Sequence, residues 1–221
     1  MPGQVRTLQP SEAIQRRFQA RRAYAGGVKT DVDLANSLSD IAARIVHDTT
    51  QRPPRCGSVR VVAIDGGAAS GKTSLADKVY STFWATERHT ELIHIDNLLD
   101  GWGDQFTFWP RLRDGVLARL ANGQAGSYQR YDWKTATFTG EIRVPPTDVL
   151  IVEGVSAIEC CGDRAAFRVL IDLPRSTRER RWSERDGTPL QPEWVRWLDA
   201  EDDYFRTSAP EADLLLGPTG P

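Results

Sequence analysis

The sequence predicts an α/β fold in which a doubly wound sheet of five parallel strands carries helices on both faces. Two observations lead to this prediction. Apolar segments of strand length alternate with segments of helical pattern from residue 58 to residue 217, and such alternation makes βαβ units, whose strands are parallel. A glycine-rich turn lies directly between the first strand and the helix that follows it. With 221 residues, 40% hydrophobic and 26% charged, the chain has the size and composition of one globular domain with an extension.

The expected strands are recognised by their apolar composition. The first, SVRVVAID, is rich in β-branched residues, and the third, DVLIVEG, has four consecutive apolar residues, as strands buried on both faces do. The helix expected after the second strand has its apolar residues at positions 112, 116, 117 and 120, which share one side. The expected strands are residues 58–65, 91–96, 148–154, 167–173 and 212–217, and the expected helices that follow the first strand are residues 72–85, 109–121, 176–185 and 193–205.

The chain is expected to divide into an N-terminal helical extension, residues 1–50, and a larger domain, residues 51–221. Residues 1–30 are strongly basic and contain no regular apolar pattern. We interpret this start as a flexible terminus, and an arm that contacts a partner is the alternative.

One helix is expected at the end of the extension. Four apolar residues from Leu34 to Ile45 repeat with helical spacing, and Asp31 or Asp33 can cap the start of the helix. The helix cannot continue through Pro53, because proline lacks a backbone donor and clashes with the preceding turn. Its single apolar stripe is typical of a helix that packs against a core.

Charge and cysteine content exclude several classes of protein. Lys and Arg total 28 and Asp and Glu total 30, so the net charge is −2, which argues against a protein that coats nucleic acid or an anionic membrane. The three cysteines, two of them adjacent, do not make a disulfide framework. The sequence also lacks a secretory signal and an apolar run of the ~20 residues that span a bilayer. We therefore expect a cytoplasmic protein without a membrane or nucleic-acid partner, and its oligomeric state stays open.

The strongest motif is GGAASGKT at residues 66–73, which fits the pattern G-x-x-x-x-G-K-[ST] at every fixed position. Because it follows an apolar strand and precedes a helix, it predicts a phosphate-binding loop and therefore the P-loop NTPase fold. The loop amides and the helix dipole attract phosphate oxygens, Lys72 brings a charge to the β- and γ-phosphates, and Thr73 is a ligand for Mg²⁺. We expect ATP and Mg²⁺ as cofactors. The residues expected to bind the nucleotide are Gly66, Gly67, Ala68, Ala69, Ser70, Gly71, Lys72, Thr73 and Ser74.

Two acidic residues end expected strands, where side chains face the ligand crevice of an open α/β sheet. Asp96 can accept the proton of an attacking hydroxyl or hold the metal, and the alternative is that it caps the next segment. Glu153 ends a fully apolar strand and so needs a cation or donors nearby, and an exposed loop position is the alternative. The expected metal ligands are Thr73, Asp96 and Glu153.

Arginines three and four residues apart lie on one face of an expected helix. Arginines that close over a transferring phosphoryl group stabilise its charge, so we expect a lid around residues 175–190, and a solvated basic helix is the alternative. A compact chain with strand-end acids and such a lid, and without the Asn-Lys-x-Asp segment of GTPases, is typical of small-molecule kinases. The expected catalytic residues are Lys72, Asp96, Arg178, Arg181 and Arg185.

The segments IDGGAASGKTSLA, HIDNLLDGW, YQRYDW, VLIVEGV, RSTRERRWSERD and EADLLLGP together resemble the landmarks of uridine kinase and its phosphoribulokinase relatives, over residues 58–217. That family phosphorylates a hydroxyl of a small molecule with ATP and Mg²⁺. The resemblance implies that Asp96 is the catalytic aspartate, that Glu153 is the metal-associated glutamate and that the arginines belong to the lid. It also implies that Tyr131 and Trp133 surround a nucleoside base, and simple packing of a hairpin is the alternative.

Three departures from the nucleoside-specific members concern the acceptor. The stretch before Pro110 has no acid to bind ribose hydroxyls, no histidine follows the aromatic pair near Ala136, and the second arginine-rich part of the lid is missing after Arg185. The acceptor is therefore less well supported than the phosphate chemistry. The residues expected to bind it are Asp100, Trp102, Tyr131, Asp132 and Trp133, with Asp104 and Trp109 as further candidates.

The sequence thus predicts an ATP-dependent kinase that phosphorylates a hydroxyl of a small molecule, with a nucleoside among the candidate acceptors. A kinase of a non-nucleoside metabolite or antibiotic would share the chemistry and differ in the pocket. A nucleotide-binding regulatory module, to which the basic residues 16–22 would belong, would bind ATP without acceptor turnover. The net charge disfavours a kinase of nucleic-acid 5′-hydroxyls.

Overall fold

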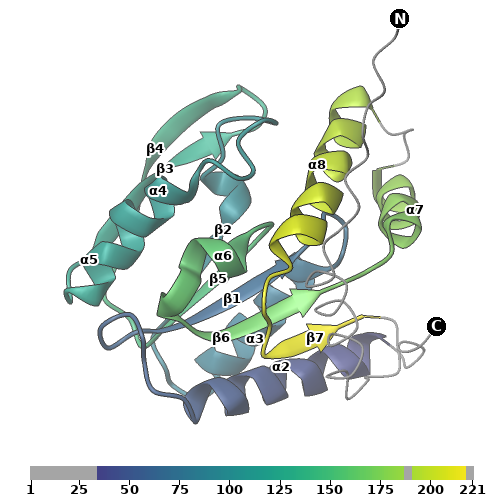
Figure 1. Cartoon of the computed structure of the whole chain (residues 1–221). Helices are drawn as coiled ribbons and strands as arrows, with labels where there is room; N and C mark the ends of the chain where they lie inside the picture. Colours follow the sequence, from purple (N-terminus) through teal and green to yellow (C-terminus); the bar gives the residue numbers. More distant parts are fainter. Residues whose placement is uncertain (1–33, 187–190, 218–221) are drawn as a thin grey trace, which may run out of the picture.

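The structure, a computed structural model, describes residues 34–186 and 191–217 (Figure 1). The basic segment of residues 1–30, both capping candidates of the first helix and residues 187–190 of the expected lid lie outside the described residues. Among the described residues, no helix is both long enough and apolar enough to cross a membrane.

A five-stranded parallel sheet forms the centre of the molecule, as the sequence predicts. The strand order is β2-β5-β1-β6-β7, so β1 is central and the chain crosses over β5 to reach β2. Because all strands are parallel, their carboxyl ends meet at one edge of the sheet, where ligands bind in such folds. The strands are β1 (Arg60–Gly66), β2 (Thr90–His94), β5 (Val149–Glu153), β6 (Ala165–Ile171) and β7 (Leu214–Leu216).

Helices cover both faces of this sheet (Figure 1). One face is covered by α2 (Leu34–Thr50) and α3 (Lys72–Trp84). The other is covered by α6 (Ala157–Cys161), α8 (Pro192–Ser208) and the expected helix of residues 109–121. That last helix forms as α4 (Trp109–Leu112), a π-helical turn η2 (Arg113–Leu117) and α5 (Ala118–Ala121). The remaining helices are α7 (Arg175–Asp186) and the short 3-10 turns η1 (Ile95–Asn97) and η3 (Gly162–Arg164).

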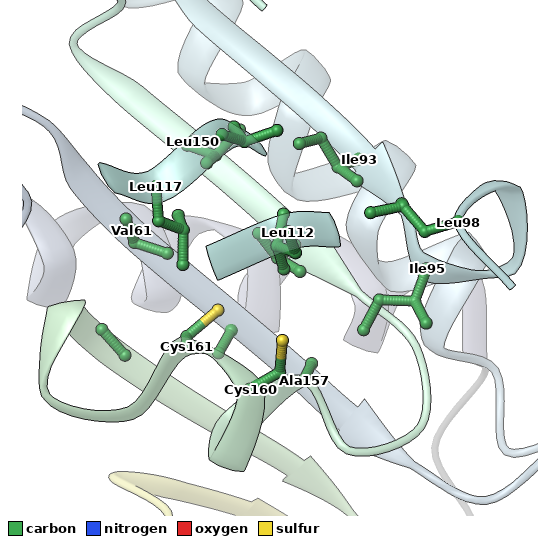
Figure 2. Packing of buried hydrophobic residues seen from close by; sticks show 14 of the residues in the cluster. Val61, Ile93, Ile95, Leu98, Leu112, Leu117, Leu150, Ala157, Cys160 and Cys161 are labelled. Atoms are coloured by element: carbon green, nitrogen blue, oxygen red, sulfur yellow. The ribbon is translucent and has the colours of Figure 1, made fainter. Parts of the chain in front are cut away.

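The core consists of two apolar layers that the sheet separates. Successive residues of β1 point to opposite faces, so Val61 belongs to the layer under α6 and Val62 to the layer under α3. In the first layer, Leu112 and Leu117 lie over the sheet, next to the side chains of Val61 and Leu150 (Figure 2). Both layers are closed to water, which explains why the strands are apolar on both faces.

The helix α2 belongs to the second layer. Ala42 and Ile45 are fully buried there, and Leu38 and Ile41 pack against the same layer. After the helix ends, the Arg52 guanidinium donates to the Ala166 carbonyl at 3.1 Å and pairs with Asp213 at 2.8 Å. The first described helix is therefore joined to the edge of the sheet.

A two-stranded antiparallel hairpin, β3 (Gly126–Asp132) and β4 (Thr137–Val144), stands beside the sheet and was not among the expected strands. Most of β4 is exposed, so it lacks the apolar pattern by which the other strands were recognised. The hairpin approaches the η2 turn closely. A Cβ atom at Gly126 would lie 2.6 Å from the Val116 Cα, and one at Gly115 would lie 2.7 Å from the Ser127 carbonyl oxygen, so both positions require glycine.

Candidate active site

The predicted P-loop, residues 66–73, connects β1 to α3 at the carboxyl edge of the sheet. Gly71 has φ of 100° at the N-cap of α3, a conformation that glycine adopts without strain. A Cβ atom at Gly66 would lie 2.5 Å from the Ile171 carbonyl oxygen. The helix begins directly at Lys72, so its first amides and the positive end of its dipole lie next to the loop. This arrangement is suited to binding an anion.

Two cationic side chains contact the loop. Lys72 Nζ donates to the Gly67 carbonyl at 2.9 Å, and Arg181 Nη1 donates to the Ser70 carbonyl at 3.1 Å. The Ser70 hydroxyl oxygen is buried and has no hydrogen-bond partner among the described residues. The loop therefore combines backbone donors with positive charge, which is the combination that phosphate groups require.

Glu153 ends β5 and is almost completely buried. The Thr73 hydroxyl lies 3.3 Å from its Oε1, and His94 Nδ1 lies 2.7 Å from the same atom. The hydrogen bond to Glu153 raises the pKa of His94 and favours the imidazolium ion, against the effect of burial. The structure thus joins two predicted metal ligands, Thr73 and Glu153. His94 was missed by the sequence analysis, although it stands two residues before Asp96 in the segment HID.

Asp96 lies in the turn that follows β2, beside the same strand end. Its side chain is open to solvent on one side, while protein atoms displace water on the others and raise its pKa. The positive charges of Lys72, His94 and Arg185 oppose this rise. The carboxyl group of Asp96 therefore lies among opposing influences on its pKa, beside three positive charges and the end of β2.

The described residues contain no group of three or more His, Cys, Asp or Glu side chains that could hold a metal ion. The hydroxyl of Thr73 and the carboxylate of Glu153 nevertheless provide oxygen donors of the kind that Mg²⁺ prefers. Mg²⁺ commonly binds through one or two carboxylates, water and substrate phosphates. The donor set therefore fits a Mg²⁺ ion that arrives with a nucleotide.

The three expected lid arginines do not share one environment. Arg181 contacts the P-loop, and the Arg185 guanidinium lies 4.3 Å from the centroid of the Trp182 ring. Arg178 is buried and pairs with Glu201 and Asp202 of α8. The helical spacing of these arginines could not reveal that residues of α8 surround the first of them.

The aromatic candidates for the acceptor come together. The ring centroids of Trp102 and Trp133 are 5.1 Å apart, and those of Tyr131 and Trp133 are 5.2 Å apart. Trp133 Nε1 donates to the Asp96 carbonyl at 3.0 Å, which joins the hairpin to the turn of the candidate base. Trp194 and Trp197 of α8 contact Trp102 from another side. These five residues, Trp102, Tyr131, Trp133, Trp194 and Trp197, are called the aromatic group below.

The acidic candidates for the acceptor are less concentrated. Asp132 accepts a hydrogen bond from the Lys134 amide at 2.8 Å and so stabilises the hairpin turn. Asp104 accepts from the Asp100 amide at 2.8 Å and pairs with Arg111, which stabilises the loop before α4. The side chain of Asp100 is exposed. Trp109 donates to the Ser156 hydroxyl at 2.9 Å and is thereby part of the framework.

A buried carboxylate that the sequence analysis missed connects the P-loop to the rest of the site. Asp65 Oδ1 accepts hydrogen bonds from the amides of Gly66 at 2.7 Å and Ser156 at 2.9 Å, and Oδ2 accepts from the Ile158 amide at 3.0 Å. Burial raises its pKa to about 7, while these amides and Lys72 oppose the rise. An acid directly before a glycine-rich loop is the signal that could have found it.

Comparisons with known proteins add a family to this geometry. No family model matches the sequence. Uridine kinase-like protein 4 of Arabidopsis thaliana is 31% identical over 183 residues, which cover 71% of this chain and 38% of the relative. A uridine kinase of Lactococcus lactis is 29% identical over 161 residues, which cover 63% of this chain and 77% of the relative. The chain thus spans less than half of the plant relative and about three quarters of the bacterial one.

Two solved structures share the fold at 20% sequence identity. The structure of a possible uridine kinase from Bacillus stearothermophilus matches with a TM-score of 0.60, over 83% of this chain and 98% of that one. A putative fructose transport system kinase from Silicibacter matches with a TM-score of 0.53, over 80% and 98%. The chain is thus similar in sequence to a uridine kinase-like protein of a plant and to uridine kinases of bacteria, and these similarities, together with the P-loop, support a uridine kinase-like family of P-loop kinases.

Proposed function

We propose that the protein is an ATP-dependent kinase that transfers the γ-phosphoryl group to a hydroxyl of a small molecule. The observation that carries this proposal is the position of the P-loop beside Glu153 and Asp96 at one edge of the sheet. Kinases need these parts together, because phosphoryl transfer depends on positioning and on stabilisation of negative charge.

The P-loop residues 66–73 and Ser74 would hold the phosphates through backbone amides, with Lys72 at the β- and γ-phosphates. Thr73, Glu153 and, through water, Asp96 would hold Mg²⁺. When bound, the ion neutralises charge that develops on the phosphate oxygens. Lys72 now reaches only the Gly67 carbonyl within the loop, so its charge is available to a phosphate that displaces this contact.

Asp96 is proposed to accept the proton of the acceptor hydroxyl. The hydroxyl oxygen then forms a bond to the γ-phosphorus while the bond to the β–γ bridging oxygen breaks, and ADP leaves with that electron pair. Ionised Asp96 is required for this step, and the neighbouring charges of Lys72 and Arg185 favour that form. Arg181 and Arg185 would neutralise the charge of the transferring group.

The acceptor is proposed to bind against the aromatic group, next to Asp96. Trp102 and Trp133 remain 42% and 37% exposed, so each offers part of a ring for stacking. A nucleoside is the first candidate, because the relatives are named uridine kinases. A sugar or another hydroxylated metabolite is the second candidate. The stretch before Pro110 has no acidic residue that could bind ribose hydroxyls, and Trp109 in that stretch already donates a hydrogen bond to the Ser156 hydroxyl.

The test is an ATP-consumption assay with Mg²⁺ against a panel of nucleosides, sugars and other hydroxylated metabolites, with Lys72→Ala as the control. Turnover that requires both an acceptor and Lys72 supports the proposal. Turnover with uridine or cytidine identifies a nucleoside kinase, and turnover with another compound alone identifies a different acceptor pocket on the same framework. ATP binding without turnover of any acceptor, nucleosides included, would favour the regulatory module instead.

A further inference from the structure

A buried carboxylate of α8 lies against the P-loop, although the two are 133 residues apart in the sequence. Glu201 is only 1% exposed. The amide nitrogen of Ala68 lies 2.9 Å from each of its carboxylate oxygens. A hydrogen bond to an ionised acceptor is stronger than one between neutral groups. The contact with Glu201 therefore fixes the backbone of the loop at Ala68.

Two further donors hold Glu201 in place. Arg178 Nη1 donates to Oε2 at 2.9 Å, and Trp197 Nε1 donates to Oε1 at 2.7 Å. Burial raises the pKa of Glu201, whereas Lys72, the Ala68 amide, Arg178 and Trp197 favour its ionised form. A buried carboxylate is tolerated when cations and donors surround it in this way.

Arg178 also contacts the loop itself. A Cβ atom at Gly67 would lie 2.5 Å from Arg178 Nη1, so the guanidinium rests directly on the backbone of that residue. Asp202 holds the other terminal nitrogen of Arg178. The peptide between Gly67 and Ala68 is therefore fixed from α7 by Arg178 and from α8 by Glu201.

We propose that Glu201 and Arg178 form a positioning pair that holds the Gly67–Ala68 part of the P-loop in the conformation that receives phosphate. Arg178 then acts through the loop, while Arg181 and Arg185 remain the arginines for the transferring group. A glycine-rich loop loses much conformational freedom when it closes on a ligand, and holding it in advance removes that cost from binding. The proposal rests on the proposed function only in that the loop binds nucleotide phosphates.

The test uses the full chain and compares Glu201→Gln with Asp203→Asn. Glutamine keeps the size of the side chain and one acceptor oxygen but removes the charge. Asp203 lies on the same helix, is exposed and pairs with Arg206, so its variant makes the same charge change away from the loop. Binding of ADP and of ATP, each with Mg²⁺, is measured by calorimetry, and thermal unfolding is recorded for each protein.

We expect Glu201→Gln to weaken the binding of both ADP and ATP by about tenfold, because the hydrogen bond to the loop loses its charged acceptor. Asp203→Asn should bind both nucleotides as the wild type does. Arg178→Met should likewise weaken both nucleotides, and the double variant should be no weaker than the more affected single variant. A residue that contacts only the γ-phosphate would instead change the binding of ATP and leave ADP unaffected.

Hydrogen exchange of the loop peptide without nucleotide provides a second measurement that does not depend on activity. It should be faster in Glu201→Gln and unchanged in Asp203→Asn. If Glu201→Gln does not fold, Trp197→Phe removes one donor to Glu201 while keeping an aromatic ring, and it should speed the same exchange to a smaller extent.

Three results would overturn the proposal. Unchanged nucleotide binding and unchanged loop exchange in Glu201→Gln would show that the carboxylate only stabilises the fold. Tighter nucleotide binding in this variant would show that Glu201 opposes phosphate. Neither result bears on the proposed function, which is tested by acceptor turnover of the wild type. A wild type that binds neither nucleotide would refute the proposed function and this inference together.

Discussion

The P-loop and the aromatic group lie at the same edge of the sheet, yet they are built in different ways. The P-loop is one contiguous segment, residues 66–73, whose geometry depends on backbone angles at Gly66 and Gly71. The aromatic group joins the loop before α4, the hairpin and α8 through contacts between side chains. The P-loop thus depends on backbone conformation within one segment, whereas the aromatic group depends on side chains from three segments.

This difference has a consequence for specificity. The transfer of the phosphoryl group is the same reaction for every acceptor, so one arrangement of the P-loop serves all of them. The acceptor differs between kinases, and a surface made of side chains from three segments can be adapted to it. The sequence accordingly fits the P-loop pattern at every fixed position, whereas its expected acceptor residues fit no comparable pattern. The predictions below test whether the two regions are as separate as this comparison suggests.

The largest effect is expected for Lys72→Ala. The variant removes the charge that would reach the β- and γ-phosphates, so kcat should fall about a thousandfold or more. The fold should persist, because the side chain of Lys72 is not part of the apolar core and its Nζ donates to a carbonyl of its own loop. Turnover and thermal unfolding are measured beside Lys78→Ala, which removes a lysine later on the same helix. Equal activity of the two variants would contradict the role of Lys72.

A smaller but still large effect is expected for Asp96→Asn. Asparagine keeps the shape of the side chain and cannot accept the proton, so kcat should fall about a hundredfold while ATP binds normally. Asp114→Asn, an exposed change on the η2 turn, serves as the matched control. If ATP binding is lost along with turnover, Asp96 serves nucleotide binding and does not accept the proton of the acceptor.

The third prediction concerns Asp65, which joins the two regions. Its carboxylate holds the Gly66 amide of the P-loop and the Ser156 amide, and the Ser156 hydroxyl accepts from Trp109 and donates to the Gln105 carbonyl. This chain of buried contacts runs from the phosphate side to the segment before α4. A change at Asp65 should therefore affect the stability of both regions.

The raised pKa of Asp65 determines whether the protein becomes more or less stable as the pH rises. Burial raises the folded pKa from 3.8 to about 7, so the carboxyl group takes up a proton on folding at intermediate pH. Its contribution to stability is complete below pH 3.8 and is lost as the pH rises through 7. From pH 5 to pH 7, the wild type should lose about 2 kcal/mol relative to Asp65→Asn, as measured by denaturant unfolding at each pH. A difference between the two proteins that does not vary with pH would refute the assignment.

These contacts also show what the sequence could and could not predict. The five parallel strands and the P-loop follow from local patterns, namely apolar runs and a glycine-rich turn, and both are confirmed. The partners of the buried acids do not follow from such patterns. Glu201 stands next to two further acidic residues in the sequence, and only the packing of α8 shows that it is buried against Ala68.

The two strands of the hairpin were not among the expected strands for a different physical reason, although a hairpin was considered at Tyr131 and Trp133. Its strands are half exposed and carry polar residues, so they lack the apolar signal of the central sheet. Its aromatic residues were nevertheless identified as candidates for the acceptor, because the residue types suit stacking. Residue chemistry was informative there although the secondary structure was not.

The smallest effect is expected for Trp102→Ala, which tests the aromatic group directly. Trp102 contacts Trp133, Trp194 and Trp197 and is 42% exposed, so its loss removes ring surface without opening the core. The KM for the acceptor should rise about three- to tenfold, the range for loss of an aromatic contact, while the KM for ATP stays unchanged. Trp84→Ala removes a more exposed tryptophan at the far end of α3 and should change neither constant. If both KM values rise together in Trp102→Ala, then the contact from Trp197 through Glu201 to Ala68 transmits the change, and the two regions act as one site.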